Sequence, residues 1–359
     1  MDNLLLAFRK AKRGKSKKDY VINFELYLQR NLKQLQEDLI NKSYAPCSLK
    51  KFIIRDPKTR IIHSSIFIDR IVHHAIINII EPIYEKMFIY DSFASRKNKG
   101  THNAVIRFKT FINKVSSNGS LIRQPYNNNS IKGFVLKADI KHYFDSIDHK
   151  LLINIIKKKI TDEDFIYLIK KVIGNFITEN EKGLPLGNYT SQFFANVYLN
   201  ELDYYIKHVL KAKYYIRYVD DFVILHKNKK RLEYFKSCIE NFLPCLKIKL
   251  HPDKTKIYAL RNGITFLGYR VFYHYTILRK RNIKYFDKKF NELIGLYICG
   301  EISKEQLENK LNGWFGYAKF GDTFNFRNII LKSVNNINHL SKKSNDGEND
   351  HDDLDILCI

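Results

Sequence analysis

An Asp-Asp pair between two β-forming runs is the feature that most constrains how this chain folds. Residues 214–219 and 222–225 are rich in aromatic and β-branched side chains, and only Asp220 and Asp221 separate them. Two polar residues between two such runs predict a β-hairpin. An Asp pair in a turn is usually turn chemistry, because Asp tolerates strained backbone and bonds to its own loop. The Asp pair by itself therefore predicts two paired strands and does not indicate an activity.

A third carboxylate ends another predicted strand. Residues 134–140 alternate in the pattern of a half-buried strand, with Asp139 on the face opposite the apolar one. Three carboxylates in a strongly basic chain point to a cationic ligand, and a pair of divalent metal ions suits them. Two such ions, about 3.5–4 Å apart, stabilise the attacking and leaving oxygens of a phosphoryl transfer. Hard oxygen ligands favour Mg²⁺, with Mn²⁺ as an alternative.

The charge balance predicts a polyanionic partner. Lys and Arg number 62 against 37 Asp and Glu, which gives a formal net charge of +25. Such an excess is typical of proteins that bind nucleic acid. No apolar run approaches the roughly 20 residues of a membrane span, so we expect no membrane partner and a cytoplasmic location. The five cysteines include no Cys-x-x-Cys pair, so no zinc site is predicted.

The carboxylates lie within motifs that resemble the reverse transcriptase family of prokaryotic type. The run 218–221, Tyr-Val-Asp-Asp, resembles the family's Tyr-x-Asp-Asp box, and residues 136–149 resemble its first carboxylate strand. Residues 183–192 resemble the loop and helix start that lie against the template and the incoming nucleotide. Residues 266–269 resemble the primer-grip hairpin. The motifs follow the family's order, and the resemblance covers about residues 20–335.

The resemblance implies an α+β fold of the right-hand polymerase type, with fingers, a palm of antiparallel sheet backed by helices, and a helical thumb. It also implies an enzyme, an RNA-directed DNA polymerase. The regions expected along the chain are an N-terminal basic arm with fingers over 1–138, a palm over 139–275 with a fingers portion interleaved at about 150–190, a thumb over 276–340, and a disordered acidic tail over 341–359.

The family's site roles carry over to the matching positions of this sequence. Asp139 and Asp220 would hold both metal ions, and Asp221 would be the third catalytic carboxylate. The nucleotide-binding positions that the resemblance implies are Lys58, Arg60, Phe144, Gly187, Gln192 and Lys254. The template-binding or primer-binding positions that it implies are Arg96, Phe266, Leu267, Gly268 and Tyr269.

Several of these roles have a plain structural alternative. Phe144 would block a ribose 2′-OH and so select deoxynucleotides, but it could instead be ordinary core. Lys254 would act as a general acid at the leaving pyrophosphate, with Lys256 as a near-equal candidate. Gln192 would either bond to a base or cap its helix. Lys58 would either hold the triphosphate or remain a solvated charge.

The loop at 186–192 points to one branch of the family. Its Leu-Gly-Asn-Tyr-Thr-Ser-Gln sequence resembles the enzymes of diversity-generating retroelements, which copy a template RNA with errors at adenines. That branch implies an RNA template, a DNA or RNA primer, deoxynucleoside triphosphates, a cDNA product and a small basic accessory protein as partners. Two alternatives stay open: a stand-alone antiphage-defence reverse transcriptase, and a catalytically silent nucleic-acid-binding module on the same fold.

Overall fold

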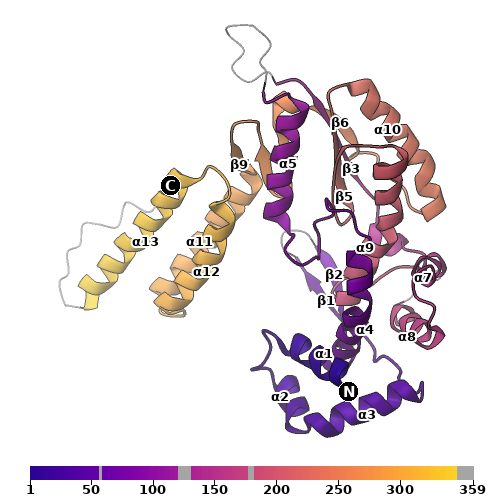
Figure 1. Ribbon diagram of the computed structural model, residues 1–359. Coiled ribbons are helices and arrows are strands. Elements are labelled where there is room, and N and C mark those ends of the chain that lie inside the picture. The colour runs from indigo at the N-terminus through magenta and orange to yellow at the C-terminus, as the bar shows by residue number, and fades with distance from the viewer. Residues whose placement is uncertain (56–58, 120–130, 177–181, 346–359) are drawn as a thin grey trace. The chain divides into compact units, whose positions relative to one another are not determined.

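The chain divides into two compact units in a computed structural model (Figure 1). The first unit contains residues 1–111 and 133–258, and the second contains 112–132 and 259–359. The structure describes residues 1–55, 59–119, 131–176 and 182–345, with side chains as far as Asn336. Lys58 and the acidic segment 346–359 lie outside the described residues, whereas residues 341–345 of the predicted tail belong to a helix.

The N-terminal part of the first unit is a helical assembly followed by an exposed hairpin. The hairpin strands pair antiparallel, and Phe52 and Ile53 are exposed on it. Helix α1 packs along α4, which buries Ala7 and Phe8 of the basic N-terminal segment against an apolar helix. The elements are α1 (Asp2–Lys12), α2 (Asp19–Leu26), α3 (Leu28–Ile40), β1 (Lys50–Ile54), β2 (Arg60–Ser64) and α4 (Phe67–Glu85).

A four-stranded sheet in the first unit carries the three predicted carboxylates. Its strands lie in the order β4 (Tyr214–Tyr218), β5 (Asp221–His226), β3 (Phe134–Asp139) and β6 (Lys256–Ala259). Strand β5 pairs antiparallel with both β4 and β3. The alternation predicted for β3 is confirmed on its apolar side, because Leu136 and Ala138 lie in the main core. Asp139 is therefore on the other face, at the end of the strand.

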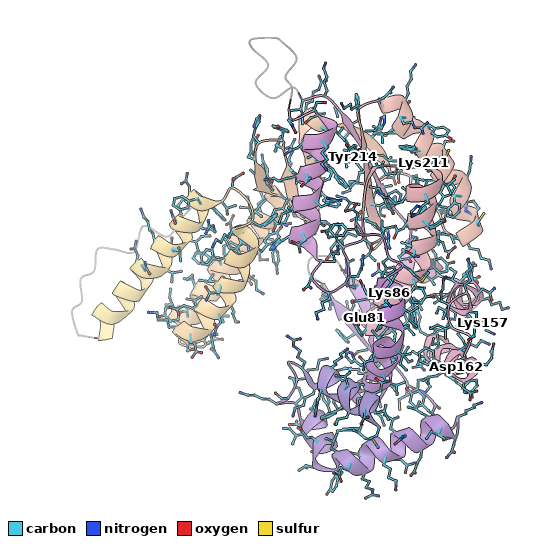
Figure 2. The ribbon with its side chains drawn as sticks, in the orientation of Figure 1. Glu81, Lys86, Lys157, Asp162, Lys211 and Tyr214 are labelled. Atoms are coloured by element: carbon cyan, nitrogen blue, oxygen red, sulfur yellow. The ribbon has the colours of Figure 1, made fainter. Side chains whose placement is uncertain are left out.

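Helices cover this sheet and join it to the N-terminal assembly. Helix α10 packs on β3 and β5, while α9 packs on α4 and α7. Helix α8 begins at the capping side chain of Asp162, which accepts a bond from the Phe165 amide, and the α7 residue Lys157 pairs with Glu163 on the surface. Figure 2 labels Lys157 on α7 and Asp162 at the start of α8. The helices are α6 (Tyr143–Ser146), α7 (His149–Lys157), α8 (Glu163–Gly174), α9 (Tyr189–Tyr204) and α10 (Lys229–Phe242).

The second unit combines a small sheet with three helices. Its strands β7 (Ile264–Phe266), β8 (Tyr269–Val271) and β9 (Thr276–Leu278) form an antiparallel meander. Its helices are α11 (Lys280–Ile298), α12 (Lys304–Ala318) and α13 (Phe324–Asn345), and α5 (Thr101–Val115) begins in the first unit and ends in the second. Phe286 stacks on Trp314 at 3.5 Å between ring centroids in the helical core. Residues 259–275, which the sequence assigns to the palm, therefore share a compact body with the helices predicted as the thumb.

The predicted α+β class, an antiparallel sheet backed by helices, is confirmed. Across the described ranges, we find no helix with both the length and the apolar character needed to cross a membrane. The sheet positions the site, because the end of β3 and the start of β5 bring carboxylates from two separate parts of the chain together.

Candidate active site

The predicted hairpin is present, but its turn lies one residue earlier than the sequence indicates. Tyr218 pairs with Asp221, so the two loop residues are Val219 and Asp220, and Asp221 already belongs to β5. Val219 has a φ of 55°. A two-residue hairpin loop needs a positive φ to match the strand twist, and glycine usually supplies it. A β-branched residue in this conformation is strained, so the surrounding structure must hold it in place.

The shifted turn brings the carboxylates together. Asp139 lies directly opposite Asp221 in the β3–β5 register, and Asp220 lies at the adjoining turn. The pKa of Asp220 is raised to about 6, first by burial and then by the nearby charges of Asp221 and Asp139. Burial also raises the pKa of Asp221; Lys137 opposes this shift and Asp139 adds to it. Each ionised group therefore disfavours the others, as expected of carboxylates gathered for a cation.

A lysine supplies positive charge to this cluster. The Lys254 Nζ atom donates to Asp139 Oδ1 at 2.7 Å. The His251 amide donates to the Asp139 carbonyl at 2.7 Å, which draws the loop that carries Lys254 beside the strand end. This contact favours Lys254 over Lys256 as the lysine of the site, although its role as a general acid stays a prediction.

The chemistry of the donor set fits a divalent metal ion. Three carboxylates with mutual repulsion offer hard oxygen ligands in a partly buried place. Within the parts of the chain that the structure describes, no three His, Cys, Asp or Glu side chains already stand in a metal-holding arrangement. Lys254 would have to release Asp139 for an ion to be bound there. Asp139, Asp220 and Asp221 are thus the residues that would hold it.

Two predicted nucleotide-binding residues lie in contact with the body of the first unit. The ring of Phe144 is half-buried and lies edge-on to Tyr143, with 5.6 Å between centroids. Gly187 has a φ of 119°, and a Cβ there would lie 2.6 Å from Cγ2 of Ile62 on β2. Close packing of this loop on β2 therefore requires glycine in its own right. The predicted roles of both residues in nucleotide binding stay predictions.

Gln192 and Arg96 also have protein partners. Gln192 Oε1 accepts a bond from the Ser95 hydroxyl at 3.0 Å. The guanidinium of Arg96 pairs with Glu85 at 2.8 Å and donates to the carbonyls of Ile89 and Ser92, and the side chain is 6% exposed. Arg96 therefore anchors its own loop, and its predicted contact with a template stays untested.

The predicted triphosphate and primer residues lie in different units. Arg60 is exposed at the start of β2, opposite Ile54, in the first unit. In the second unit, Phe266 and Tyr269 are the buried ends of β7 and β8.

The turn between β7 and β8 is fixed by hydrogen bonds to the Gly268 carbonyl. Leu267 and Gly268 have φ values of 48° and 92°. The Gly268 carbonyl accepts bonds from the Arg279 amide, from Asn282 Nδ2 at 3.3 Å and from the Tyr317 hydroxyl at 2.9 Å. The predicted primer-grip hairpin is thereby fixed to α11 and α12.

Sequence reasoning missed a buried ion pair beside the carboxylates. Arg217 and Asp203 are both fully buried, and Arg217 Nη2 lies 2.6 Å from Asp203 Oδ2. The available signal was a charged residue in the middle of an otherwise β-forming run, with an acidic residue near the end of the apolar helix before it. Buried charges are almost always paired, so each of the two residues predicts a partner.

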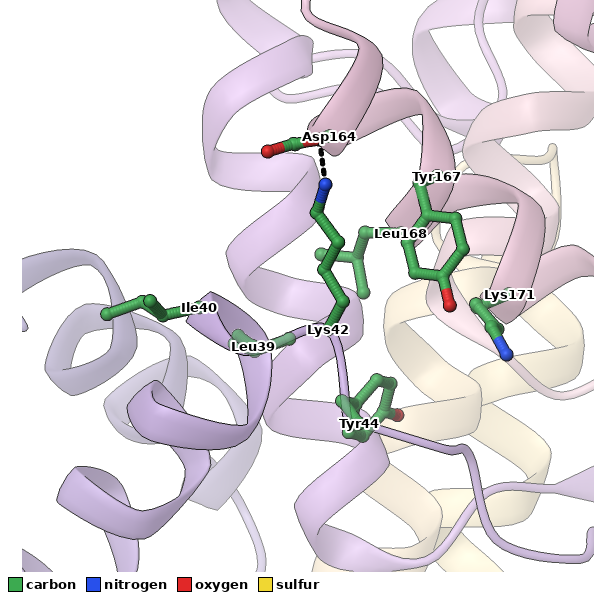
Figure 3. Close-up of a pocket in the computed structure, with 8 residues that line it drawn as sticks. All are labelled: Leu39, Ile40, Lys42, Tyr44, Asp164, Tyr167, Leu168 and Lys171. Atoms are coloured by element: carbon green, nitrogen blue, oxygen red, sulfur yellow. Dashed lines mark ion pairs between the residues drawn. The ribbon is translucent and has the colours of Figure 1, made fainter.

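A cavity of about 350 Å³ lies elsewhere in the first unit, between the end of α3 and α8 (Figure 3). Lys42 reaches across it to Asp164, and the ring of Tyr167 forms part of its wall. Its lining includes none of the predicted site residues.

Comparison with known proteins supplies independent information. The family model described as "Reverse transcriptase (RNA-dependent DNA polymerase)" matches residues 50–271. Protein YkfC of Escherichia coli (strain K12) is 27% identical over 293 residues, which cover 70% of this chain and 72% of YkfC. The group II intron-encoded protein LtrA of Lactococcus lactis subsp. cremoris is 30% identical over 196 residues, which cover 52% of this chain and 29% of LtrA.

Solved structures of telomerase also align with the chain. Apo telomerase from Candida tropicalis, truncated from its C-terminal domain, has a TM-score of 0.46 at 15% identity and covers 68% of this chain. The alignment spans 59% of that telomerase chain. The chain thus spans most of YkfC, a smaller part of LtrA and little more than half of this telomerase.

Proposed function

Because the chain belongs to the reverse transcriptase family, we propose that it copies RNA into DNA by two-metal phosphoryl transfer at Asp139, Asp220 and Asp221. The family's enzyme class is RNA-directed DNA polymerase, and the matched residues 50–271 include all three carboxylates. The observation that carries the site assignment is the register that sets Asp139 opposite Asp221. Like charges directly opposed destabilise a sheet, and a cationic ligand accounts for keeping them there.

The proposed reaction is attack of a primer 3′-hydroxyl on the α-phosphorus of a deoxynucleoside triphosphate, with pyrophosphate leaving. Two divalent ions, when bound, would neutralise charge on the attacking and leaving oxygens. Lys254 would release Asp139 and donate a proton to the leaving pyrophosphate. Arg60, exposed on β2, would bind the triphosphate through charge-assisted hydrogen bonds.

The direct test is primer extension on an RNA template with Mg²⁺ and deoxynucleoside triphosphates. Replacing Asp220 and Asp221 together by Ala should abolish incorporation, because the proposed ligands of both ions are lost. RNA binding, measured by fluorescence anisotropy without divalent ions, should survive. Full incorporation by this double variant would contradict the site assignment.

A matched control is available in the first unit. Glu163 and Asp164 are also adjacent acidic residues, and their side chains are 70% and 72% exposed. Replacing both by Ala removes the same charge and breaks only surface ion pairs, which contribute little to stability. This control should extend primers as the unaltered protein does.

Sugar selection supplies a second test. We propose that the ring of Phe144 blocks a ribose 2′-hydroxyl, a role that its half-buried position permits. Phe144→Ala should raise the ratio of ribonucleotide to deoxynucleotide incorporation, measured in the same assay with each sugar alone. Tyr143→Phe keeps the neighbouring ring and should leave the ratio unchanged. An unchanged ratio in Phe144→Ala would return this residue to the core.

We further propose that the enzyme works in a diversity-generating retroelement, with a small basic accessory protein as partner. The support is the sequence of the loop at 186–192. The neighbouring DNA tests this setting: a repeat pair that differs at adenine positions, beside a small basic gene, is the expected finding. A structured RNA gene without such repeats would favour the antiphage-defence alternative.

A further inference from the structure

We propose that Arg217 is a positioning residue for the catalytic turn: its buried guanidinium fixes the Val219 carbonyl and, through that peptide, the place of Asp220. The inference rests on the proposed function, because it concerns the same carboxylates. Arg217 lies two residues before the turn, and its side chain points to the helix side of β4, together with Tyr215.

The guanidinium is anchored first by a carboxylate. Arg217 Nε donates to Asp203 Oδ1 at 2.7 Å and Nη2 donates to Asp203 Oδ2 at 2.6 Å, and both side chains are 0% exposed. This two-point pairing sets the plane of the guanidinium as well as its position. Asp203 also accepts a bond from the Tyr215 hydroxyl at 2.6 Å, which fixes the carboxylate in turn.

The remaining nitrogen reaches the turn. Arg217 Nη1 donates to Asn196 Oδ1 at 3.0 Å and to the Val219 carbonyl oxygen at 3.1 Å. That carbonyl belongs to the peptide group whose nitrogen is that of Asp220. Because Val219 holds a φ of 55°, which β-branched residues rarely adopt, the turn needs support from outside its own backbone. Nη1 supplies a bond of this kind.

The groups that hold the guanidinium of Arg217 are themselves bonded to α9 and to residues 91–94. Asn196 Nδ2 donates to the Ala94 carbonyl at 2.9 Å. The Arg217 amide donates to the Asp91 carbonyl, and its own carbonyl accepts from the Phe93 amide, each at 3.0 Å. Helix α9, which carries Asp203 and Asn196, is buried along most of its length. The guanidinium therefore connects the turn to α9 and to residues 91–94, so that the position of the turn depends on theirs.

A purely structural ion pair is the alternative. Buried ion pairs often stabilise no better than apolar side chains of the same volume, so stability alone gives little reason to keep one here. The two roles differ in what they predict. A structural pair would loosen the sheet and α9 together when broken, whereas a positioning residue would loosen residues 219–222 selectively.

The test uses the full chain without metal, followed by Mn²⁺ addition. Arg217→Lys keeps a charge for Asp203 but loses the planar fork that reaches Asp203 and Val219 at once. Hydrogen exchange at the amides of 219–222 should accelerate selectively, and Mn²⁺ affinity, measured by electron paramagnetic resonance, should fall about 10–100-fold. RNA binding should be unchanged. Tyr215→Phe removes a bond to Asp203 but keeps the turn contact, so it should leave both readouts unchanged.

A second variant guards against misfolding. Arg217→Met combined with Asp203→Leu replaces the ion pair by apolar side chains of similar size, so no unpaired charge stays buried. The core should remain protected while the turn exchanges faster.

The possible results separate the two proposals. Unchanged exchange at 219–222 in both variants, or acceleration spread evenly over the sheet and α9, would overturn the positioning role. Mn²⁺ binding that is absent from the unaltered protein would contradict the metal site of the proposed function, and turn exchange would still decide the role of Arg217.

Discussion

Two of the hairpin turns that the structure describes place a bulky residue at a positive φ, and different donors support them. The β4–β5 turn in the first unit places Val219 at a φ of 55°, and the β7–β8 turn in the second unit places Leu267 at 48°. In each, a carbonyl of the turn is held by donors from a neighbouring helix or strand. The donor is a buried, charged guanidinium in the first and neutral groups in the second.

The difference follows from what each turn carries. The β4–β5 turn brings Asp220 and Asp221 beside Asp139, so its surroundings already contain repelling charges. A guanidinium locked to Asp203 orients that turn and adds no net charge to the core. The β7–β8 turn, Leu267 and Gly268, contains no ionisable residue, and the Gly268 carbonyl accepts bonds from the Arg279 amide, Asn282 and Tyr317. The charged support should therefore be costlier to break than the neutral one.

The largest expected effect comes from breaking the charged support. Asp203→Ala leaves Arg217 buried without its carboxylate, which should lower the free energy of unfolding of the first unit by about 3–5 kcal/mol. Native-state hydrogen exchange measures this for each unit separately. The neutral counterpart, Asn282→Ala, should cost the second unit about 1 kcal/mol. Equal losses in the two variants would remove the distinction between the turns.

A smaller effect, of opposite sign, is expected from removing a repelling charge. The pKa of Asp220 is raised from an ordinary 3.8 to about 6, first by burial. The folded state therefore binds this proton more tightly than the unfolded chain, and stability falls as pH rises through that interval. This shift in the pKa of Asp220 changes the free energy of unfolding by at most about 3 kcal/mol.

Asp220→Asn cannot ionise, so it should be more stable than the unaltered protein at pH 7.5 and lose that advantage towards pH 4. Thermal unfolding in a chelator across this range measures the difference. Asp253→Asn, at a side chain that is 87% exposed, should show no such trend. A variant that gains no stability at pH 7.5 would mean that burial and the neighbouring carboxylates do not raise the pKa of Asp220 in the folded protein.

Much of the fold and the carboxylate trio could be predicted from sequence, because both depend on local pattern. The alternation of 134–140 placed Asp139 away from the core, and the β-forming runs around Asp220 predicted the hairpin. The turn was predicted one residue late. Polarity marks where apolar runs stop, whereas the pairing of Tyr218 with Asp221 depends on the left-handed Val219.

Side-chain partners were harder to predict, because they depend on tertiary packing. Arg217 and Asp203 lie 14 residues apart, and the packing of α9 on the sheet decides that they meet. Arg96 matched a motif, yet it forms an ion pair with Glu85 of α4, which no pattern in the sequence singles out. Gly187 matched a motif as well, and its contact with Ile62 required knowing that the loop lies on β2.

The smallest effect tests the neutral turn. Gly268 has a φ of 92°, and a Cβ there would lie 2.6 Å from the Tyr317 hydroxyl that supports its carbonyl. Gly268→Ala should therefore lower the stability of the second unit by about 1–2 kcal/mol, measured by hydrogen exchange of α12. Gly295→Ala in α11 meets nothing within 4 Å and should instead stabilise that unit by about 0.5–1 kcal/mol. Because the carboxylates belong to the first unit, Mn²⁺ binding should be unchanged in both variants, and a loss of it in Gly268→Ala would show that the two turns do not act independently.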